Sequence, residues 1–380
     1  MYERVGLGKQ FNLADGHAHQ MQDPVQREII RGLPTVFADG ERTPQADLEA
    51  SFQETFYRLA HQHRAIRHPR TLLCPSASQS IDLVAAFLGA RRMSVGLLQP
   101  CFDNLAAMLT RRGVKLTAVS EASLRGERLA QTIAATAVDA LFLVLPNNPT
   151  GFTLDPAGLQ NLAERCAAAG KMLIVDWTFR FFDGQPAWDQ YEMLDRSGVS
   201  YVCIEDTGKT WPTLELKCSI LASSADVYGG LTAPHSDLLL NVSPFVLRLL
   251  VEYLADTERR GFERSVYHHI RSNRELLDDA LRGSVLLPRR QGRLLSVEWV
   301  YVDSEHLSGL DVVRAFGADG IGILPGEHFF WGEPRLGAAY VRVALARDSV
   351  MFDSACRRMH DVITRVPGLL GAGQPLSDAR

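Results

Sequence analysis

The stretch IEDTGKTWPTLELK, residues 204–217, decides the fold, because it places Lys209 directly after a β-strand. Two polar signals precede it in a fixed order. PNNPTG puts Asn148 at the end of the apolar strand ALFLVLP, and KMLIVDW ends the next strand with Asp176. Asp176 follows Asn148 by 28 residues and Lys209 follows Asp176 by 33, each about one βα unit. Because the carboxyl ends of parallel strands share one edge of a sheet, the three side chains are expected to converge on one crevice.

This trio is the set of groups that pyridoxal phosphate requires. A lysine such as Lys209 forms a Schiff base with the cofactor aldehyde. A carboxylate such as Asp176 keeps the pyridine nitrogen protonated, so that the ring can accept electrons. An amide such as Asn148 donates to the phenolic oxygen of the ring. The sequence therefore predicts pyridoxal phosphate as cofactor.

Strands alternate with helices through the first two thirds of the chain, which predicts an α/β fold with a mostly parallel sheet. ALFLVLP is apolar throughout, as expected of a strand covered on both faces. Asp155-Pro156 opens the following helix and Gly170 stops it. From about residue 243 the pattern changes to long helices and two late strands, typical of a smaller α+β domain. The predicted division is an arm at 1–40, a large cofactor-binding domain at 41–240 and a small domain at 241–380.

The composition fits a globular enzyme, with 380 residues of which 46% are hydrophobic and 22% charged. The formal net charge of −4 and the lack of a basic run predict no nucleic-acid partner. Six scattered cysteines without a CxxC pair predict free thiols in a reducing cytoplasm, and the absence of a histidine cluster at ligand spacing predicts no metal site. The start has no apolar core of a signal peptide, and no apolar run reaches about 18 residues, which predicts no membrane span.

The order Asn-Pro-Thr-Gly, Asp, Lys resembles fold-type I pyridoxal-phosphate enzymes, the aspartate aminotransferase superfamily, over roughly residues 35–375. The resemblance implies that the turn SASQS binds the cofactor phosphate through Ala77 and Ser78, and that Phe102 stacks on the pyridine ring. It also implies a dimer of identical chains. A late arginine grips the substrate α-carboxylate in this superfamily, and Arg342 is favoured for that role over Arg347.

Two positions depart from the aminotransferase pattern. The superfamily commonly has a phosphate-clamping arginine eight residues after the Schiff-base lysine, where this chain has Lys217. A tyrosine that bonds the phenolic oxygen is replaced by Phe179, which changes the electronics of the ring and argues against a routine aminotransferase. Thr178 is expected to reach the phosphate instead.

The arm carries a narrower resemblance. FNLADGHAHQ, together with IEDTGKTWPTLELK, resembles pyridoxal-phosphate- and O2-dependent L-arginine oxidases, the hydroxylases and desaturases of antibiotic pathways such as enduracididine biosynthesis. It implies that Glu3, Asp15 and Asp206 hold the guanidinium of L-arginine, a planar cation with five donors. It also implies that His17 acts as a base when water adds at Cγ.

Several functions remain open at this level. The first is an oxidase of free L-arginine that uses O2 without metal or flavin and releases 4-hydroxy-2-oxoarginine, 2-oxoarginine and peroxide. The second is a desaturase that gives a dehydroarginine derivative. The third is a plain aminotransferase, in which the same deprotonated intermediate is reprotonated on the cofactor. A catalytically inert regulator is disfavoured by the intact Lys-Asp-Asn set.

Overall fold

The apolar strands of the sequence build one large sheet. The computed structural model describes residues 2–126, 128–184, 188–291 and 294–371, so the ends of the 1–40 and 241–380 ranges lie outside the described residues. Within them the large sheet has seven strands in the order β2-β8-β7-β6-β5-β3-β4. Only β8 runs antiparallel to both of its neighbours. The strands are β2 (Thr71–Cys74), β3 (Ser94–Gln99), β4 (Lys115–Ser120), β5 (Ala140–Val144), β6 (Met172–Asp176), β7 (Tyr201–Asp206) and β8 (Ser219–Ser223).

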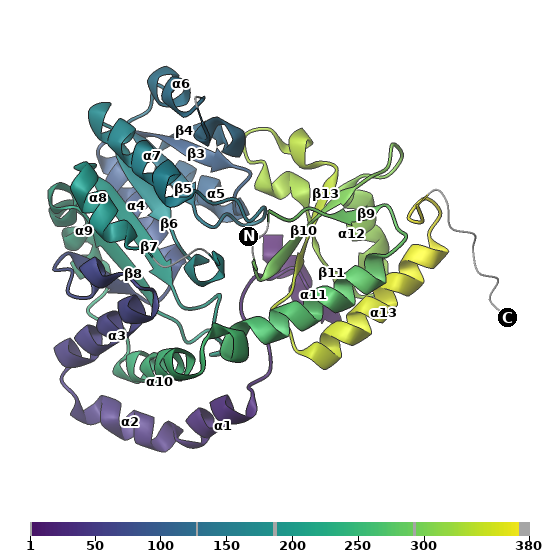
Figure 1. Cartoon of the computed structure of the whole chain (residues 1–380), viewed down its shortest axis with the longest axis horizontal. Coiled ribbons are helices and arrows are strands. Elements are labelled where there is room, and N and C mark those ends of the chain that lie inside the picture. Colours follow the sequence, from purple (N-terminus) through teal and green to yellow (C-terminus); the bar gives the residue numbers. More distant parts are fainter. Residues whose placement is uncertain (1, 127, 185–187, 292–293, 372–380) are drawn as a thin grey trace.

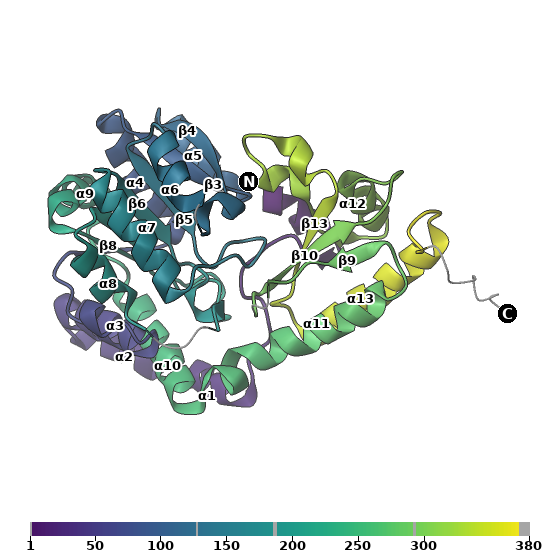
Figure 2. The same cartoon turned by 45° about the horizontal axis from the view of Figure 1, so that its top comes forward.

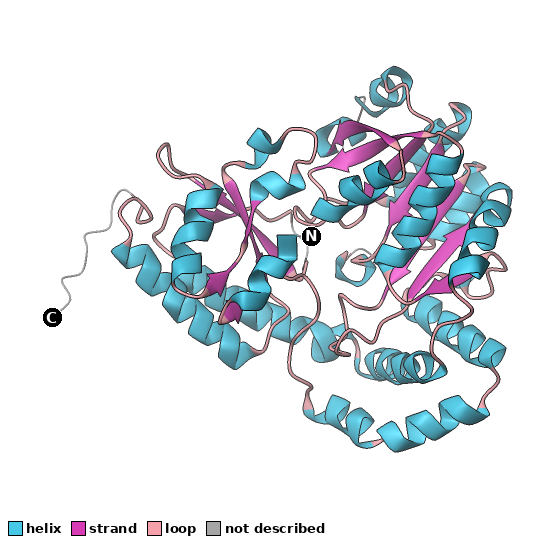
Figure 3. Cartoon of the chain, turned by 180° about the vertical axis from the view of Figure 1, so that it is seen from behind, coloured by secondary structure: helices cyan, strands magenta, loops and turns pink. Residues whose placement is uncertain are grey.

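Helices cover both faces of this sheet, as the opposite views in Figure 1 and Figure 3 show. This cover explains why every residue of β5, β6 and β7 is buried. The α-helices of this part are α1 (Pro24–Arg31), α2 (Leu33–Arg42), α3 (Gln45–Leu59), α4 (Ala77–Ala90), α5 (Asp103–Arg111), α6 (Arg128–Ala135), α7 (Pro156–Ala168), α8 (Gln190–Ser197), α9 (Ala225–Leu238) and α10 (Pro244–Arg260).

Local sequence signals set the ends of these helices. Asp155 caps α7, with its Oδ1 accepting from the Gly158 N–H at 2.7 Å, and Pro156 takes the first helical position. The chain leaves α7 through Gly170, at a φ of +64° that glycine adopts without strain. The sequence predicted both the start of this helix at Asp155-Pro156 and its end at Gly170. Because the helix ends there, the chain returns to the sheet and β6 pairs with β5.

The smaller unit is built on an antiparallel sheet in the order β12-β13-β10-β9, with helices on one face (Figure 2). Its elements are β9 (Leu286–Pro288), β10 (Val297–Val302), β12 (Leu324–Pro325), β13 (Tyr340–Ala344), α11 (His268–Leu281), α12 (Gly309–Ala318) and α13 (Ser349–Arg365). Its separate hydrophobic core includes Ile270, Val300 and Phe352. Short 3₁₀ segments lie at Tyr2–Gly8, His63–Ala65, Glu121–Leu124, Arg180–Phe182, Gly326–Phe329 and Pro334–Gly337, and a π-turn at Glu263–Tyr267.

Helix α10 lies on the side of the large unit. It packs against α2 and α3, and Leu247, Leu250 and Tyr253 belong to the same core as the large sheet. The chain leaves α10 at Gly261, where the long helical stretch of the sequence is interrupted. The predicted domain boundary at residue 240 therefore assigns α10 to the small domain, although α10 packs into the core of the large unit.

The arm between the two units is held by its backbone. β1 (Phe11–Asn12) pairs in parallel with β11 (Ile321–Gly322), and the Ala344 N–H donates to the Leu13 carbonyl at 2.9 Å. On the other side the Ala18 N–H donates to the Gly208 carbonyl at 3.3 Å, in the segment that carries Lys209. The arm thus connects the small unit to the cofactor segment. In the described part of the chain, no helix combines the length and hydrophobicity that crossing a bilayer requires.

Candidate active site

An inner pocket opens at the carboxyl edge of the large sheet, where the sequence predicted a crevice. Asn148, Asp176 and Lys209 all line it, although they lie at the ends of three different strands, β5, β6 and β7. The other lining residues are Glu3, His17, Ser76, Ala77, Ser78, Ile81, Phe102, Asn104, Val144, Thr178, Phe179, Asp206 and Lys217.

One end of the inner pocket is suited to an anion. Ser76 caps α4, and its Oγ accepts from the Gln79 N–H at 3.3 Å, so the first turn presents Ala77 and Ser78 to the pocket. A helix N-terminus attracts a phosphate through its N–H groups and its dipole. Lys217 adds a positive charge. A Cβ on Gly208 would lie 2.6 Å from the Lys217 Cδ, so a larger residue at position 208 would displace this lysine side chain.

Asp176 lies at the base of the inner pocket and is held by Thr178. The Thr178 hydroxyl and N–H both donate to Asp176 Oδ1, at 2.5 and 2.9 Å. The hydroxyl proton of Thr178 is thus engaged at the carboxylate, and the contact of Thr178 with the phosphate stays a prediction. Burial raises the pKa of Asp176, against the opposing effects of Thr178 and the Lys209 charge. A buried carboxylate of this kind favours a cationic partner such as a protonated ring nitrogen.

The remaining groups fit a flat polar ligand. The Phe102 ring lies with its centroid 5.7 Å from the Lys209 ammonium, as expected of an aromatic that covers a ring attached to that lysine. Asp206 Oδ1 and Asn104 Oδ1 are buried without a hydrogen-bond partner among the described residues. A buried polar atom without a hydrogen bond costs free energy, and a bound ligand that donates to it removes this cost. The inner pocket therefore fits pyridoxal phosphate, with Lys209, Asp176, Ala77, Ser78 and Lys217 as the residues that would hold it.

Arg342 lies fully buried beside the inner pocket. Its Nη1 donates to Asn148 Oδ1 at 3.3 Å and its Nη2 to Glu3 Oε1 at 2.9 Å. Asn148 and Arg342 are thus adjacent, and the role of Arg342 at a substrate carboxylate stays a prediction. Glu3 was predicted to hold the guanidinium of the substrate L-arginine. In this structure its carboxylate pairs with the guanidinium of Arg342.

Arg347, the competing candidate, has a different role in the structure. Its guanidinium donates to the carbonyl oxygens of Asn12, Asp15 and His17, with 2.7 Å from Nε to Asn12 and 2.9 Å from Nη1 to His17. Burial lowers the pKa of Arg347 to about 10, so it is cationic at neutral pH. These contacts hold the arm, which leaves Arg342 as the candidate for a substrate carboxylate.

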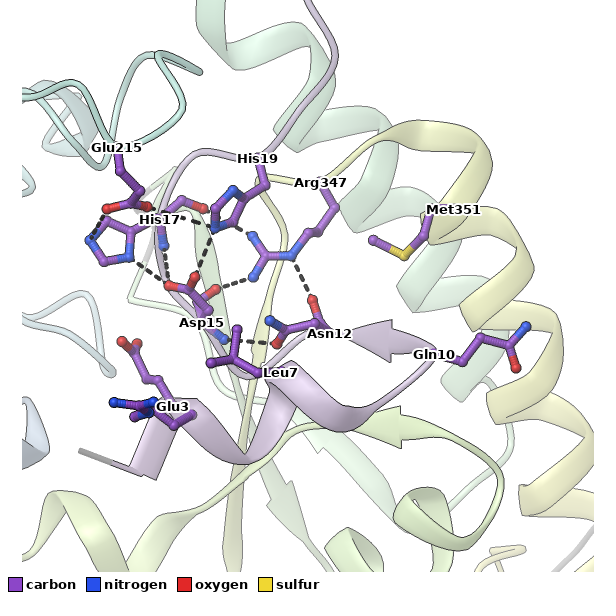
Figure 4. A pocket seen from close by; sticks show the side chains of 11 residues that line it. Glu3, Leu7, Gln10, Asn12, Asp15, His17, His19, Glu215, Arg347 and Met351 are labelled. Atoms are coloured by element: carbon purple, nitrogen blue, oxygen red, sulfur yellow. Dashed lines mark hydrogen bonds and ion pairs between the residues drawn. The ribbon is translucent and has the colours of Figure 1, made fainter.

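A second, outer cavity of about 520 Å³ is lined mostly by residues of the arm (Figure 4). Glu3 and His17 line both cavities, while Asp15 lines only the outer one. Asp15 Oδ1 lies 2.6 Å from His17 Nδ1, and Lys217 Nζ lies 3.0 Å from His17 Nε2. Burial lowers the pKa of His17, assisted by the charges of Lys209 and Lys217 and opposed by Asp15, so its imidazole is uncharged at neutral pH.

Asp206 lies in the inner pocket, apart from Asp15 in the outer cavity. Burial raises the pKa of Asp206 to about 6, opposed by the charges of Lys217 and Lys209. The three carboxylates predicted to hold a guanidinium are therefore spread along the two cavities. Glu205, the neighbour of Asp206, is fully buried and paired with Arg180 at 2.5 Å, on the opposite face of β7.

Residues that the sequence reasoning missed also line the outer cavity. His19 Nε2 lies 2.7 Å from Asp15 Oδ2, and Glu215 Oε2 lies 3.6 Å from His17 Nε2 (Figure 4). This corrects the expectation that no histidine cluster has ligand spacing. The two-residue spacing in DGHAH was the available signal, but Glu215 comes from a loop about 200 residues away. We call these four side chains the arm cluster: Asp15, His17, His19 and Glu215.

Comparison with known proteins agrees with this site. A family model described as aminotransferase class I and II matches residues 8–295. The solved structure of MppP soaked with the product 2-ketoarginine is 34% identical, covers 92% of this chain and 99% of its own, and has a TM-score of 0.85. Thermus thermophilus aspartate aminotransferase with maleate, at 16% identity and a TM-score of 0.75, covers 94% of this chain and 92% of its own, and it shows the fold alone.

One curated relative matches in part. Threonine-phosphate decarboxylase of Salmonella typhimurium strain LT2 is 30% identical over 164 residues. The match spans 41% of this chain and only 40% of the decarboxylase. Together these comparisons confirm the predicted α/β fold of the aspartate aminotransferase superfamily and the likeness to MppP.

Proposed function

The chain belongs to the class I and II aminotransferase family, and we propose that it is a pyridoxal-phosphate-dependent oxidase of free L-arginine that uses O2. The proposed product is 4-hydroxy-2-oxoarginine, with 2-oxoarginine as the less oxidised product. L-Arginine, two O2 and two waters would give 4-hydroxy-2-oxoarginine, ammonia and two molecules of hydrogen peroxide. With one O2 and one water the reaction would stop at 2-oxoarginine, ammonia and one peroxide.

The substrate proposal is supported by the 34% identity to MppP, whose solved structure was soaked with the product 2-ketoarginine. The observation that carries it in this chain is the pair of adjoining cavities. Arg342 beside the inner pocket suits an α-carboxylate, and Asp15 in the outer cavity suits a guanidinium. Asp206 in the inner pocket and Asp15 in the outer cavity offer a long cationic side chain an anionic partner in each cavity, and Glu3 lines both.

The residues of the chain have separate tasks in this proposal. When bound, pyridoxal phosphate supplies an electron sink for the charge left by loss of the Cα proton. Lys209 takes up that proton on Nζ. His17 takes a proton on Nε2 from the water that adds at Cγ, while Asp15 holds its Nδ1–H. We expect the arm to limit the access of bulk water to the inner pocket, because its backbone is bonded to both sides of the site.

The test is to mix the holoenzyme with L-arginine in air and to follow O2 uptake, peroxide and product masses in ¹⁸O-labelled water. The proposal expects O2 consumption without a keto-acid acceptor and a labelled hydroxyl in the product. Turnover that needs a keto acid and consumes no O2 would instead make the protein an aminotransferase. A dehydroarginine product without a labelled hydroxyl would make it a desaturase.

A further inference from the structure

The arm cluster combines the donor types that transition metals prefer. It offers two imidazoles and two carboxylates, whose ligand atoms all lie within 4.8 Å of one another. His17 and His19 both contact Asp15, at 2.6 and 2.7 Å, from opposite carboxylate oxygens. Glu215 lies 3.6 Å from the imidazole of His17 and 3.9 Å from that of His19.

We propose that the arm cluster is a binding site for one divalent transition-metal ion of the Zn²⁺ type. Imidazole nitrogen and carboxylate oxygen suit Zn²⁺ and its neighbours, whereas Mg²⁺ and Ca²⁺ prefer sites made of oxygen alone. Two carboxylates balance the charge of a divalent ion. The cluster faces the outer cavity of about 520 Å³, which gives an ion access and leaves room for water ligands (Figure 4).

Lys217 presently competes for part of this site. Its ammonium lies 2.5 Å from Glu215 Oε2 and 3.0 Å from His17 Nε2. The same side chain lines the inner pocket, where a cofactor phosphate would give the ammonium a second anionic partner. When Lys217 turns to that phosphate, the imidazole of His17 and the carboxylate of Glu215 become available to a metal. The holoenzyme is therefore the form expected to bind the ion.

The loop that supplies Glu215 is built for this position. Leu214 and Glu215 have φ values of +52° and +67°, a conformation that costs free energy in residues other than glycine. The Leu214 side chain is 84% exposed, so the strain is not repaid by burying it. This backbone conformation directs the Glu215 carboxylate toward the imidazoles of His17 and His19.

Metal binding would oppose the proposed reaction, and this part of the inference rests on the proposed function. Asp15 and His17 would be ligands, and the proposed function assigns them to the guanidinium and to proton transfer. An ion in the arm cluster and L-arginine in the outer cavity would then exclude each other. The site would act as an inhibitory metal site.

The experiment uses holoenzyme freed of metals by a chelator and then titrated with Co²⁺, whose visible d–d absorption reports nitrogen and oxygen ligands. The expected result is one Co²⁺ per chain, displaced by Zn²⁺. His19→Ala and Glu215→Gln should each weaken binding at least as much as the ~10–100-fold lost with an outer-shell partner. His63→Ala, which removes an exposed histidine away from the cluster, is the control and should bind as wild type.

Two variants keep the test decisive if one fails to fold, since Glu215 lies on an exposed loop and His19 on the arm. Equal Co²⁺ affinity in wild type, His19→Ala and Glu215→Gln would overturn the site, as would the absence of stoichiometric binding. Adding L-arginine then separates the two proposals. Displacement of Co²⁺ supports competition, while unchanged Co²⁺ binding leaves the metal site standing and counts against a guanidinium at Asp15.

Discussion

At the scale of single residues, Lys209 is the buried lysine that is predicted to bind the cofactor. It is 7% exposed, faces Phe102 and shares the inner pocket with Asp176. Its role could be predicted because the motifs that carry Asn148 and Asp176 precede it in a fixed order, each about one βα unit apart. The partner of Glu3 was not predictable, because Arg342 lies 339 residues further along the chain and no local pattern connects the two.

Lys209→Ala should lose covalent attachment of pyridoxal phosphate, because Lys209 is the predicted Schiff-base lysine, whereas Lys217, the second amine that lines the inner pocket, is expected at the phosphate. Borohydride reduction followed by intact-mass measurement should show the cofactor adduct in wild type and none in the variant. Lys115→Ala, an exposed lysine on β4, is the matched control and should keep the adduct. An adduct that persists in Lys209→Ala would show that another amine carries the cofactor.

Asp206 should make substrate capture sensitive to pH. Burial raises its pKa to about 6, so the uncharged acid accumulates as the pH falls through that value and attraction for a cation is lost. We expect kcat/KM for L-arginine to fall below pH about 6. Asp206→Asn should remove this inflection and lower kcat/KM at pH 8 by about 10- to 100-fold, since bonds to charged groups contribute about 1.5–3 kcal/mol. A pH–rate profile that keeps the inflection in Asp206→Asn would assign it to another group.

His17→Ala should change the product more than the rate of oxidation. Its neutral imidazole is placed by Asp15 for proton transfer to water, while Lys209 handles the Cα proton. O2 uptake with L-arginine should continue, and the share of hydroxylated product should fall in favour of 2-oxoarginine or unsaturated products. Product masses and an O2 electrode measure both. An unchanged share of hydroxylated product would remove His17 from the reaction.

At the scale of elements, the arm is fixed by pairing that lies far apart in the sequence. β1 is two residues long, too short for alternation to reveal, and its partner β11 begins more than 300 residues later. The strands β5, β6 and β7 were predictable, since unbroken apolar runs with capped helices between them specify buried parallel strands. The antiparallel direction of β8 was not, because the residues of a buried strand carry no sign of which way it runs.

Arg347→Ala should loosen the arm. The substitution leaves the carbonyls of Asn12, Asp15 and His17 without their donor, and an unmet buried group costs about 1–3 kcal/mol. We expect faster amide exchange over residues 11–19, a lower free energy of unfolding and a raised KM for L-arginine. Hydrogen-exchange mass spectrometry localises the change. Arg335→Ala, an exposed arginine of the small unit, should leave the arm protected, and equal exchange in both variants would argue against this role.

At the scale of the whole molecule, two units with separate cores meet around the arm. The sequence predicted both units, because the change of pattern after the large sheet is visible in hydrophobicity alone. It did not predict that α10 packs with α3, since an amphipathic helix does not reveal which of two cores receives its apolar face.

We expect the active protein to be a homodimer, as the superfamily resemblance implies. Light scattering on the holoenzyme should give about twice the chain mass of 42.1 kDa. A fully active species at the mass of one chain would contradict this expectation. Dilution to the point of dissociation should lower specific activity if the partner chain completes the site.

Arg347 supports the arm through contacts to its backbone and not to its side chains. It recognises carbonyl oxygens, which every amino acid possesses, so the support that Arg347 gives the arm does not depend on which side chains stand at positions 15, 17 and 19. The Asp15 carboxylate adds one bond of its own, accepting from the His17 N–H at 2.9 Å. Natural variation or laboratory evolution can therefore rewrite those positions while the scaffold keeps its course. Substrate preference in such a protein is free to diverge by point substitution, and a library limited to these three codons is a practical route to new specificities.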